Sequence, residues 1–247
     1  MNKLTEFLME EQQAKRKGGL YHKTQVQLAY NSNRIEGSKL TEEQTRYIFE
    51  TRTIGFKDQA AVPVDDIIET TNHFIAFDDL LRTIDEPLTE DLIKEFHRRL
   101  KTGTADAQLS YFNVGDYKKL ANEVGGHETC KPAAVAAEMK SLQEWYHVQK
   151  DVTIHTLAEY HWRFESIHPF QDGNGRVGRL ILFRECLRNS IMPFVIDNEH
   201  KMYYYRGLSE FKQTPDFLVG TMQSAQDVYE AWIKYFNEEL LEGLRIE

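Results

Sequence analysis

Inward-facing positions recur every three to four residues along most of the chain, which predicts helices rather than strands. Separate segments begin at Pro63, Thr89, Pro132 and Thr214-Pro215, all residues suited to the start of a helix. The positions predicted to face inward are Val64, Ile67, Ile68, Thr71, Phe74, Ile75 and Leu81; Leu92, Phe96 and Leu100; Val135, Met139, Leu142 and Trp145 or Tyr146; Ile154, Leu157, Ala158, His161, Phe164 and Ile167; Val177, Leu180, Ile181 and Leu187; and Leu218, Met222, Ala225, Val228, Tyr229 and Trp232. Since no strands alternate with these helices, the pattern predicts a mainly α protein.

One stretch, from Ser110 to Lys131, lacks this helical spacing. Two short segments around Lys119–Ala121 and His127–Thr129 bracket the sequence Val124-Gly125-Gly126, which is suited to a tight turn. A small hairpin or irregular flap and a plain surface loop both fit this stretch.

Composition and charge narrow the class of protein. The chain has 247 residues, of which 41% are hydrophobic and 28% charged, as in ordinary globular proteins. Its net charge of −9 argues against nonspecific nucleic-acid binding, and no apolar run approaches the ~20 residues that span a bilayer. Residues 1–11 are too acidic for a signal peptide, and two cysteines are too few for a disulfide framework. We expect a cytoplasmic protein that binds neither nucleic acid nor membrane.

The candidate chemistry lies in one segment that begins at His168 and reads His-Pro-Phe-Gln-Asp-Gly-Asn-Gly-Arg-Val-Gly-Arg. Pro169 ends the preceding helix, and a glycine-rich turn leads into the next one. The unpaired N–H groups and positive dipole end at the start of that helix favour a phosphate. Arg176 and Arg179 are three residues apart, so both can face the same anion. His168 and Asp172 flank the turn as a candidate base and a candidate Mg²⁺ ligand.

Three other interpretations of this segment fail. The Gly-x-Gly-x-x-Gly pattern that starts at Gly173 matches a dinucleotide-binding fingerprint, but that fingerprint requires a preceding strand. Asp172 begins a sequence like a calcium loop, yet Phe183 stands where the loop needs a glutamate. An Asn-Gly hairpin is excluded because the flanking spacing is helical.

The same segment resembles the signature of the Fic family, His-Pro-Phe-x-Asp/Glu-Gly-Asn-Gly-Arg-x-x-Arg, with every defining position filled. The surrounding helical layout agrees over roughly Thr89 to Leu208. The resemblance implies a Fic fold, a mainly α helical bundle with a small β-hairpin flap. It divides the chain into an N-terminal helical region (1–84), a Fic catalytic core (85–210) and a C-terminal helix packed on the core (211–247).

The resemblance also implies roles for individual residues. His168 takes the proton from an incoming Ser, Thr or Tyr hydroxyl, and Asp172 holds Mg²⁺. Arg176 contacts the phosphates of ATP, and Arg179 holds the γ-phosphate. The anion hole for the α-phosphate consists of Asn174 and the backbone N–H groups of Gly173 and Gly175.

A flap is implied as well. Gly115-Asp116-Tyr117-Lys118 resembles a Gly-x-Tyr/Phe-Arg element of Fic proteins, with lysine in place of arginine. In the family this element precedes a hairpin that holds a target segment by strand pairing. The residues implied in target docking are Leu120, Ala121, Asn122, Glu123 and Val124. After the signature, Tyr204 is the candidate for lining the adenine pocket, and a core aromatic is the alternative.

A second signal lies near the N-terminus. The run 24–36 has helical spacing and meets Gly37, a residue type common just after a helix. Glu36 is then an anion at the negative end of the helix dipole, either exposed or paired with a cation. Thr41 and Gln44 form a capping box for the next helix.

This run ends in a sequence that resembles the Fic inhibitory motif, Ser/Thr-x-x-x-Glu-Gly/Asn, with Ser32, Glu36 and Gly37 at the defining positions. In the family, an N-terminal motif of this kind inhibits its own chain. The resemblance therefore implies that Glu36 pairs with Arg179 and takes the cation that the γ-phosphate needs.

Taken together, the resemblance implies a self-inhibited, Mg²⁺-dependent protein adenylyltransferase (AMPylator). Its partners are ATP and a protein target with a hydroxyl side chain, and self-modification and a homo-oligomer are compatible with it. Alternatives within the family are removal of AMP, both activities in one enzyme, and transfer of another nucleotide-linked group. A nucleotide-sensing regulator with little turnover is the non-enzyme alternative, against which the intact His168 and Asp172 argue.

Overall fold

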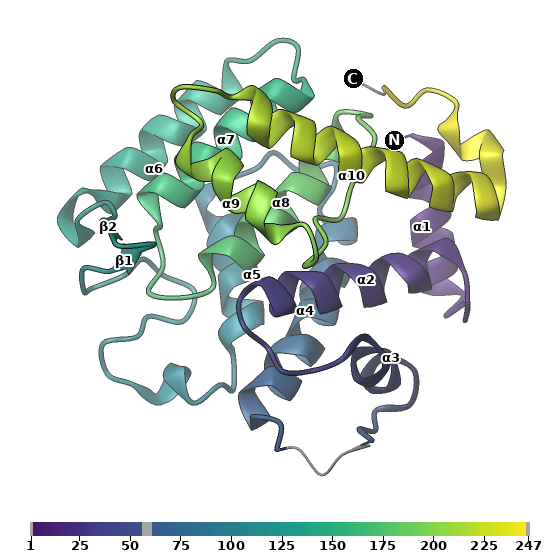
Figure 1. Ribbon diagram of the computed structural model, residues 1–247, viewed down its shortest axis with the longest axis horizontal. Helices are drawn as coiled ribbons and strands as arrows, with labels where there is room; N and C mark the ends of the chain where they lie inside the picture. The colour runs from purple at the N-terminus through teal and green to yellow at the C-terminus, as the bar shows by residue number, and fades with distance from the viewer. Residues whose placement is uncertain (1, 56–60, 246–247) are drawn as a thin grey trace.

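Helices make up most of the chain in a computed structural model that describes residues 2–55 and 61–245 (Figure 1). The α-helices are α1 (Lys3–Gln13), α2 (Leu20–Ile35), α3 (Glu42–Thr51), α4 (Val64–Arg82), α5 (Glu90–Lys101), α6 (Pro132–His147), α7 (Ile154–Ile167), α8 (Asn174–Arg188), α9 (Lys201–Ser209) and α10 (Asp216–Asn237). Two 3₁₀ helices, η1 (Asp106–Gln108) and η2 (Glu238–Leu241), and two strands, β1 (Glu123–Val124) and β2 (His127–Glu128), complete the described elements. The strands pair antiparallel, so the expected mainly α fold with a small hairpin is confirmed.

Helix α8 lies at the centre of the fold. Every residue from Asn174 to Leu187 is buried, because α2, α4, α5 and α7 all pack against this helix. Its buried charges are paired inside the core, where Arg184 contacts Glu185 and the hydroxyl of Tyr146 donates to Glu185 at 2.6 Å. The start of α8, which carries the candidate chemistry, is therefore held by the best-packed part of the molecule.

One hydrophobic core extends through the regions expected from the sequence, from Leu4 in α1 to Leu240 in η2. Contacts between α1 and η2 bring the first and last described helices together, as Figure 1 shows at the right of the view. The core has no break near residues 84 or 210, and the three-region division stays a prediction. What matters for the site is that α2 contacts α8 although the two are far apart in the sequence.

Several local predictions are confirmed. Thr89 accepts a hydrogen bond from the backbone of Leu92, and Thr41 and Gln44 form a complete capping box. Helix α6 begins at Pro132, and all six positions predicted to face inward on α7 are buried. These signals depend on short-range geometry, which the local sequence determines.

Other inward-facing predictions are wrong. Val64 and Ile75 of α4 are 68% and 43% exposed, and Val228 of α10 is 50% exposed. On α4 the buried face instead includes Thr70 and His73, since this helix turns polar residues toward α2 and α8. The spacing of apolar residues alone does not predict a buried face that includes polar residues.

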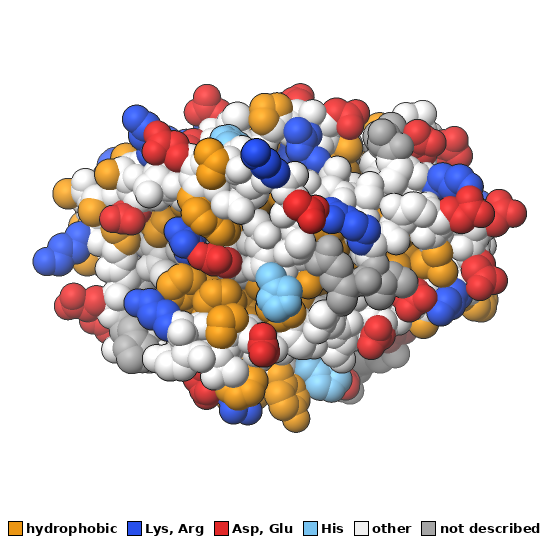
Figure 2. Space-filling model, turned by 90° about the horizontal axis from the view of Figure 1, so that it is seen from above, with side chains coloured by type: hydrophobic (Ala, Val, Ile, Leu, Met, Phe, Trp, Pro, Cys, Tyr) orange, Lys and Arg blue, Asp and Glu red, His pale blue; other side chains and the backbone are white. Residues whose placement is uncertain are grey.

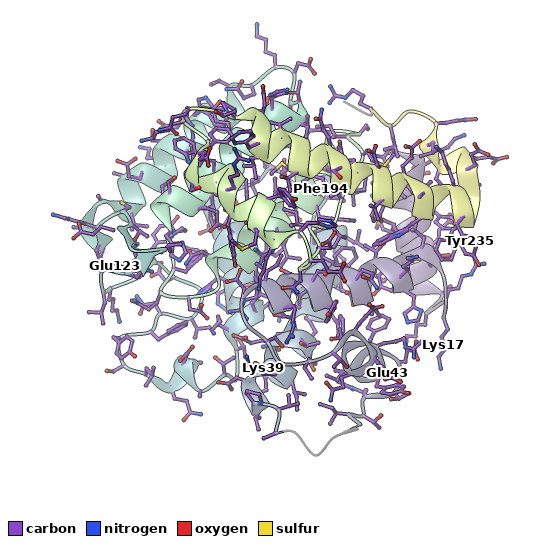
Figure 3. The ribbon with its side chains drawn as sticks, viewed as in Figure 1. Lys17, Lys39, Glu43, Glu123, Phe194 and Tyr235 are labelled. Carbon is purple, nitrogen blue, oxygen red and sulfur yellow. The ribbon has the colours of Figure 1, made fainter. Side chains whose placement is uncertain are left out.

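The hairpin also forms later in the chain than predicted. Its first strand is Glu123–Val124 rather than 119–121, and only its second strand falls where the spacing placed it. Figure 3 shows Glu123 at the edge of the molecule. The residues before β1 run instead along the signature loop, as described below.

Acidic and basic side chains are interspersed on the face seen in Figure 2, with hydrophobic side chains exposed between them. This face offers no extended surface of one charge. Among the described helices, none has an apolar stretch long enough to traverse a bilayer.

Candidate active site

The signature segment forms the connection between α7 and α8. His168 adopts a left-handed backbone conformation with φ of +50°, and Gly173 is left-handed with φ of +82° just before α8. Asn174, the first residue of α8, closes the loop on Phe170: its side chain accepts from the Phe170 N–H at 2.8 Å and donates to the Phe170 carbonyl at 2.9 Å. A glycine is required at 173, because other residues rarely adopt that conformation.

The side chain of Asn174 therefore has a different place from the one expected. Both polar atoms of its amide are occupied by Phe170, and the residue is 1% exposed. It fixes the shape of the loop, while the backbone N–H groups at the start of α8 remain the feature suited to an anion.

His97 of α5 packs against the signature loop. This residue was not identified from the sequence. Its ring stacks on Phe170 at a centroid distance of 4.0 Å. The Gly115 N–H donates to its Nδ1 at 2.9 Å, so Nε2 carries the proton and donates to the Asp172 carbonyl at 3.2 Å. Burial, then the charge of Lys101, lowers the pKa of His97 to about 3, which keeps the ring neutral. The sequence does contain a signal for His97: two polar residues, at positions 97 and 101, lie four apart beside the apolar stripe of α5.

Asp172 lies in a buried charge network. Its Oδ2 accepts hydrogen bonds from Nζ of Lys101 at 2.7 Å and from Nη2 of Arg176 at 3.0 Å. Both cations also form ion pairs with Glu69. Burial alone would raise the pKa of Asp172, but Arg176 and Lys101 outweigh it and hold the pKa well below its usual range. The carboxylate is thus ionised and fixed in one orientation, with its side chain still 46% exposed.

This arrangement fits Asp172 as the single protein ligand of a divalent cation. The described residues contain no group of three or more His, Cys, Asp or Glu side chains able to hold a metal. Mg²⁺ commonly binds through one or two carboxylates and takes its other ligands from substrate phosphates and water. Arg176, expected at the phosphates, is 3% exposed and paired with Glu69 and Asp172 here.

Arg179 is held by the end of α2. Its Nε donates to Ser32 Oγ at 2.9 Å, and its Nη2 donates to the Ser32 carbonyl at 2.9 Å and to Glu36 Oε1 at 2.7 Å. Burial disfavours the charged guanidinium, but Glu36 more than offsets this and raises the pKa of Arg179. Gly37 follows α2 with φ of +100°, as expected for the residue after a helix.

Glu36 rests directly on the first turn of α8. A Cβ atom added to Gly175 would lie 2.3 Å from its Oε1, so only glycine permits this approach. The carboxylate therefore lies beside the start of α8, the end of a helix at which an anion is favoured. The structure brings Ser32, Glu36, Gly175 and Arg179 together, as the sequence led us to expect.

His168 faces the same region and is neutral. Burial, then the positive charge of Lys118, lowers the pKa of its imidazole to about 4. A neutral imidazole at pH 7 can accept a proton, which a candidate base must be able to do.

The residues before β1 line one side of the signature loop. The Lys118 N–H donates to the Pro169 carbonyl at 2.9 Å, and its ammonium group donates to Asn122 and Thr129 at 2.7 and 2.6 Å. The Leu120 N–H and the Asn122 amide reach the loop at Gln171 and Phe170. Leu120 and Val124 are about half exposed, and Ala121 and Glu123 are exposed, so these side chains are accessible beside the site.

Tyr204 is a core aromatic, the alternative that the sequence left open. It is 1% exposed, its hydroxyl lies 2.7 Å from Nε2 of His161, and its ring lies under Arg179. Of its neighbours, Tyr205 is the one at the site, since its hydroxyl donates to the Ile35 carbonyl at 3.0 Å. The sequence alone does not show which of three consecutive tyrosines on a short helix is buried, because that depends on tertiary contacts.

Residues 87–185 match the Fic/DOC family. Protein adenylyltransferase Fic of Drosophila melanogaster and of Drosophila grimshawi are each 30% identical to this chain over 189 residues, which cover 72% of this chain and 36% of theirs. The chain thus spans about a third of the length of these relatives. A Fic domain containing signaling protein from Bacteroides thetaiotaomicron has the same fold, with a TM-score of 0.74, 23% identity and 98% of each chain covered. Fic-1 from Caenorhabditis elegans has a TM-score of 0.69 and 22% identity, covering 87% of this chain and 64% of that one. The sequence match and the fold agree with the signature loop at the start of α8: this chain carries a Fic domain and belongs to the Fic family.

Proposed function

We propose that this chain is a protein adenylyltransferase that transfers AMP from ATP to a hydroxyl side chain of a protein, and that Glu36 inhibits it from within. The observation that carries the proposal is the carboxylate of Glu36 on the first turn of α8, 2.7 Å from Arg179. A carboxylate at an anion site beside an arginine stands where a phosphate group would bind. The names of the 30% identical relatives support adenylyl transfer as the reaction.

In the active state, the γ-phosphate of ATP replaces Glu36 beside Arg179. The start of α8 then faces the α-phosphate, where negative charge grows during the reaction. Asp172 would hold a magnesium ion, which would neutralise part of the negative charge of the phosphates. Fixing the triphosphate in this way decides which phosphorus atom meets the nucleophile.

The chemical step then depends on His168. Its ring takes the proton from the target hydroxyl as the hydroxyl oxygen forms a bond to the α-phosphorus. The bond from that phosphorus to the bridging oxygen breaks, pyrophosphate leaves, and AMP stays on the target. The neutral state of His168 supports this role.

Inhibition acts through Arg179. Its contacts with Ser32 and Glu36 must be lost before a γ-phosphate can use the same cation. ATP that binds while Glu36 stays docked would have its α-phosphate misplaced. We further propose that a segment of the target docks along the accessible flap residues 120–124.

Removal of AMP is a second candidate reaction. The side chain of Glu36 is 31% exposed and is held in place by Arg179, so its carboxylate could orient a water molecule toward a bound AMP-protein. A variant without this carboxylate separates the two reactions, because it would gain AMP transfer but lose AMP removal.

Label transfer from α-³²P-ATP with Mg²⁺ tests the proposal on the protein itself and on lysate proteins. We expect labelling to rise at least 10-fold in Glu36→Gly and to disappear in Glu36→Gly/His168→Ala. Lys39→Gly, in the exposed loop just after α2 (Figure 3), is the matched control and should behave like the wild type. Equal labelling of wild type and Glu36→Gly would contradict self-inhibition, and no labelling in any variant would contradict AMP transfer.

A further inference from the structure

A second carboxylate on α7 lies behind the candidate base. Oε2 of Glu165 is 3.8 Å from Nδ1 of His168, and the Glu165 side chain is 13% exposed. His168 stands three residues later, at the left-handed end of the same helix. None of the roles described above uses Glu165.

This carboxylate is enclosed between α7 and α8. A Cβ atom added to Gly178 would lie 2.7 Å from Oε1 of Glu165 and equally close to the ring of His161. Glycine at 178 therefore lets α8 approach the carboxylate closely. The side chain is confined to a small volume next to the imidazole of His168.

The polar atoms that surround this volume are incompletely paired. Within the described chain, Oε1 of Glu165, Nδ1 of His168 and Nδ1 of His161 are buried and have no hydrogen-bond partner, although the backbone of Glu165 also acts on the His168 ring and favours its charged form. Buried polar atoms are costly unless they are paired, so such a cluster points to a contact made in another state of the site. Hydrogen bonds of catalytic groups are often long without substrate and shorten when it binds.

We propose that Glu165 is a positioning residue for His168: its carboxylate accepts a hydrogen bond from Nδ1–H and leaves Nε2 free to take the proton of the target hydroxyl. The imidazolium that forms during the reaction is then stabilised by the adjacent negative charge. This inference rests on the adenylyl transfer proposed above.

The state of Glu36 affects this arrangement. The groups that face Glu165 come from α7, α8 and α9 and from the residues just after α2 and α7: Glu36, His161, His168, Arg179, Tyr204 and Tyr205. Burial, then the negative charge of Glu36, raises the pKa of Glu165 to about 8, and Arg179 opposes this. Burial and docked Glu36 thus both favour the protonated form of Glu165. A protonated carboxyl can donate to Nδ1, which places the proton of His168 on Nε2, the wrong nitrogen for a base.

Release of Glu36 removes one of the causes that keep Glu165 neutral. The carboxylate then ionises more readily and accepts from Nδ1–H. Docked Glu36 thereby acts on the base as well as on Arg179, and both effects end together.

Histidine ¹⁵N NMR tests the proposal directly, because the shifts of Nδ1 and Nε2 report which nitrogen carries the proton. In Glu36→Gly at pH 7 we expect His168 to carry it on Nδ1. In Glu36→Gly/Glu165→Leu, where leucine occupies similar space without an acceptor, we expect the proton on Nε2 and a lower His168 pKa. Glu159→Gln, six residues earlier on the same helix, is the matched control and should leave His168 unchanged.

The kinetics of Glu165 variants provide a second test. Glu165→Gln in the Glu36→Gly background should lower kcat about 100-fold, within the range that a general base contributes, and leave the KM for ATP unchanged. Restored Nδ1 protonation in Glu165→Asp would support positioning by the carboxylate. Identical His168 shifts and pKa with and without Glu165 would overturn the inference. Because NMR needs no turnover, a changed tautomer without any label transfer would contradict the proposed reaction and leave the Glu165–His168 pairing standing.

Discussion

At the residue scale, the proposed inhibition depends on the side chains that bind Arg179. Its Nε donates to the hydroxyl of Ser32, a residue 1% exposed. Ser32→Ala removes this one hydrogen bond and leaves Glu36 in place. A hydrogen bond to a charged group contributes about 1.5–3 kcal/mol, so we expect Ser32→Ala to raise AMP transfer by roughly 10-fold, less than Glu36→Gly. Label transfer from α-³²P-ATP measures both variants.

Ser38→Ala is the control for this prediction. Ser38 is also buried near the end of α2, but its carbonyl accepts from Arg34 and it has no hydrogen bond to Arg179. Its replacement should leave transfer at the wild-type rate. If Ser32→Ala transferred AMP no faster than Ser38→Ala, the serine would be structural and inhibition would depend on Glu36 alone.

The backbone features of the candidate site that the sequence predicts correctly are those defined by glycine. Gly173, Gly175 and Gly37 are required by backbone conformation or close approach, which a short sequence specifies. The Glu36–Arg179 pair joins residues 143 positions apart and was predictable only through the resemblance to a known motif. The charge partner of Asp172, Lys101, comes from a third helix and has no such motif, so the sequence did not reveal it.

At the element scale, the fold was predictable where a helix buries one face and was not where it contacts several neighbours. Helix α7 buries all its predicted positions, whereas α4 also buries Thr70 and His73, which no apolar pattern includes. The hairpin was predicted, but its first strand was placed too early, because two-residue strands have too little alternation to fix a register. What decides these cases is packing between distant segments.

The flap gives a prediction at the same scale. Leu120 and Val124 are 48% and 47% exposed beside the signature loop, so they can contact a target segment that docks there. Leu120→Asp/Val124→Asp should lower labelling of a protein target about 30-fold, since losing apolar contact with each side chain removes on the order of 1 kcal/mol. Calorimetric binding of ATP should not change, because neither side chain contacts the α8 anion site.

Leu109→Asp is the matched control, since Leu109 is 39% exposed and lies outside the flap. It should leave target labelling as in the wild type. A double flap variant that labels its target at the unaltered rate would show that docking takes place elsewhere on the surface.

At the scale of the whole molecule, the buried charge network makes stability depend on pH. Burial lowers the pKa of His73, His97 and His161 to about 3 and that of His168 to about 4, from 6.5 in the unfolded chain. Below pH 6.5 the unfolded chain therefore binds protons that the folded chain does not, and stability falls as the pH falls. From pH 7 to 5.5 the four histidines together remove about 5 kcal/mol. Glu165, whose pKa is raised to about 8, acts in the opposite direction by about 2 kcal/mol.

The net loss of unfolding free energy is therefore about 3 kcal/mol, a large fraction of the 5–15 kcal/mol typical of a domain. Urea unfolding at pH 7 and 5.5 measures it. In the part of the chain that the structure describes, neither ring nitrogen of His73 has a hydrogen-bond partner, so His73→Met should fold well and reduce the pH-dependent loss by about 1 kcal/mol. His155→Gln, at an exposed position on α7, should leave the loss as it is. Equal stability of the wild type at both pH values would contradict the neutral, buried state of these histidines, on which the predicted role of His168 as a base also depends.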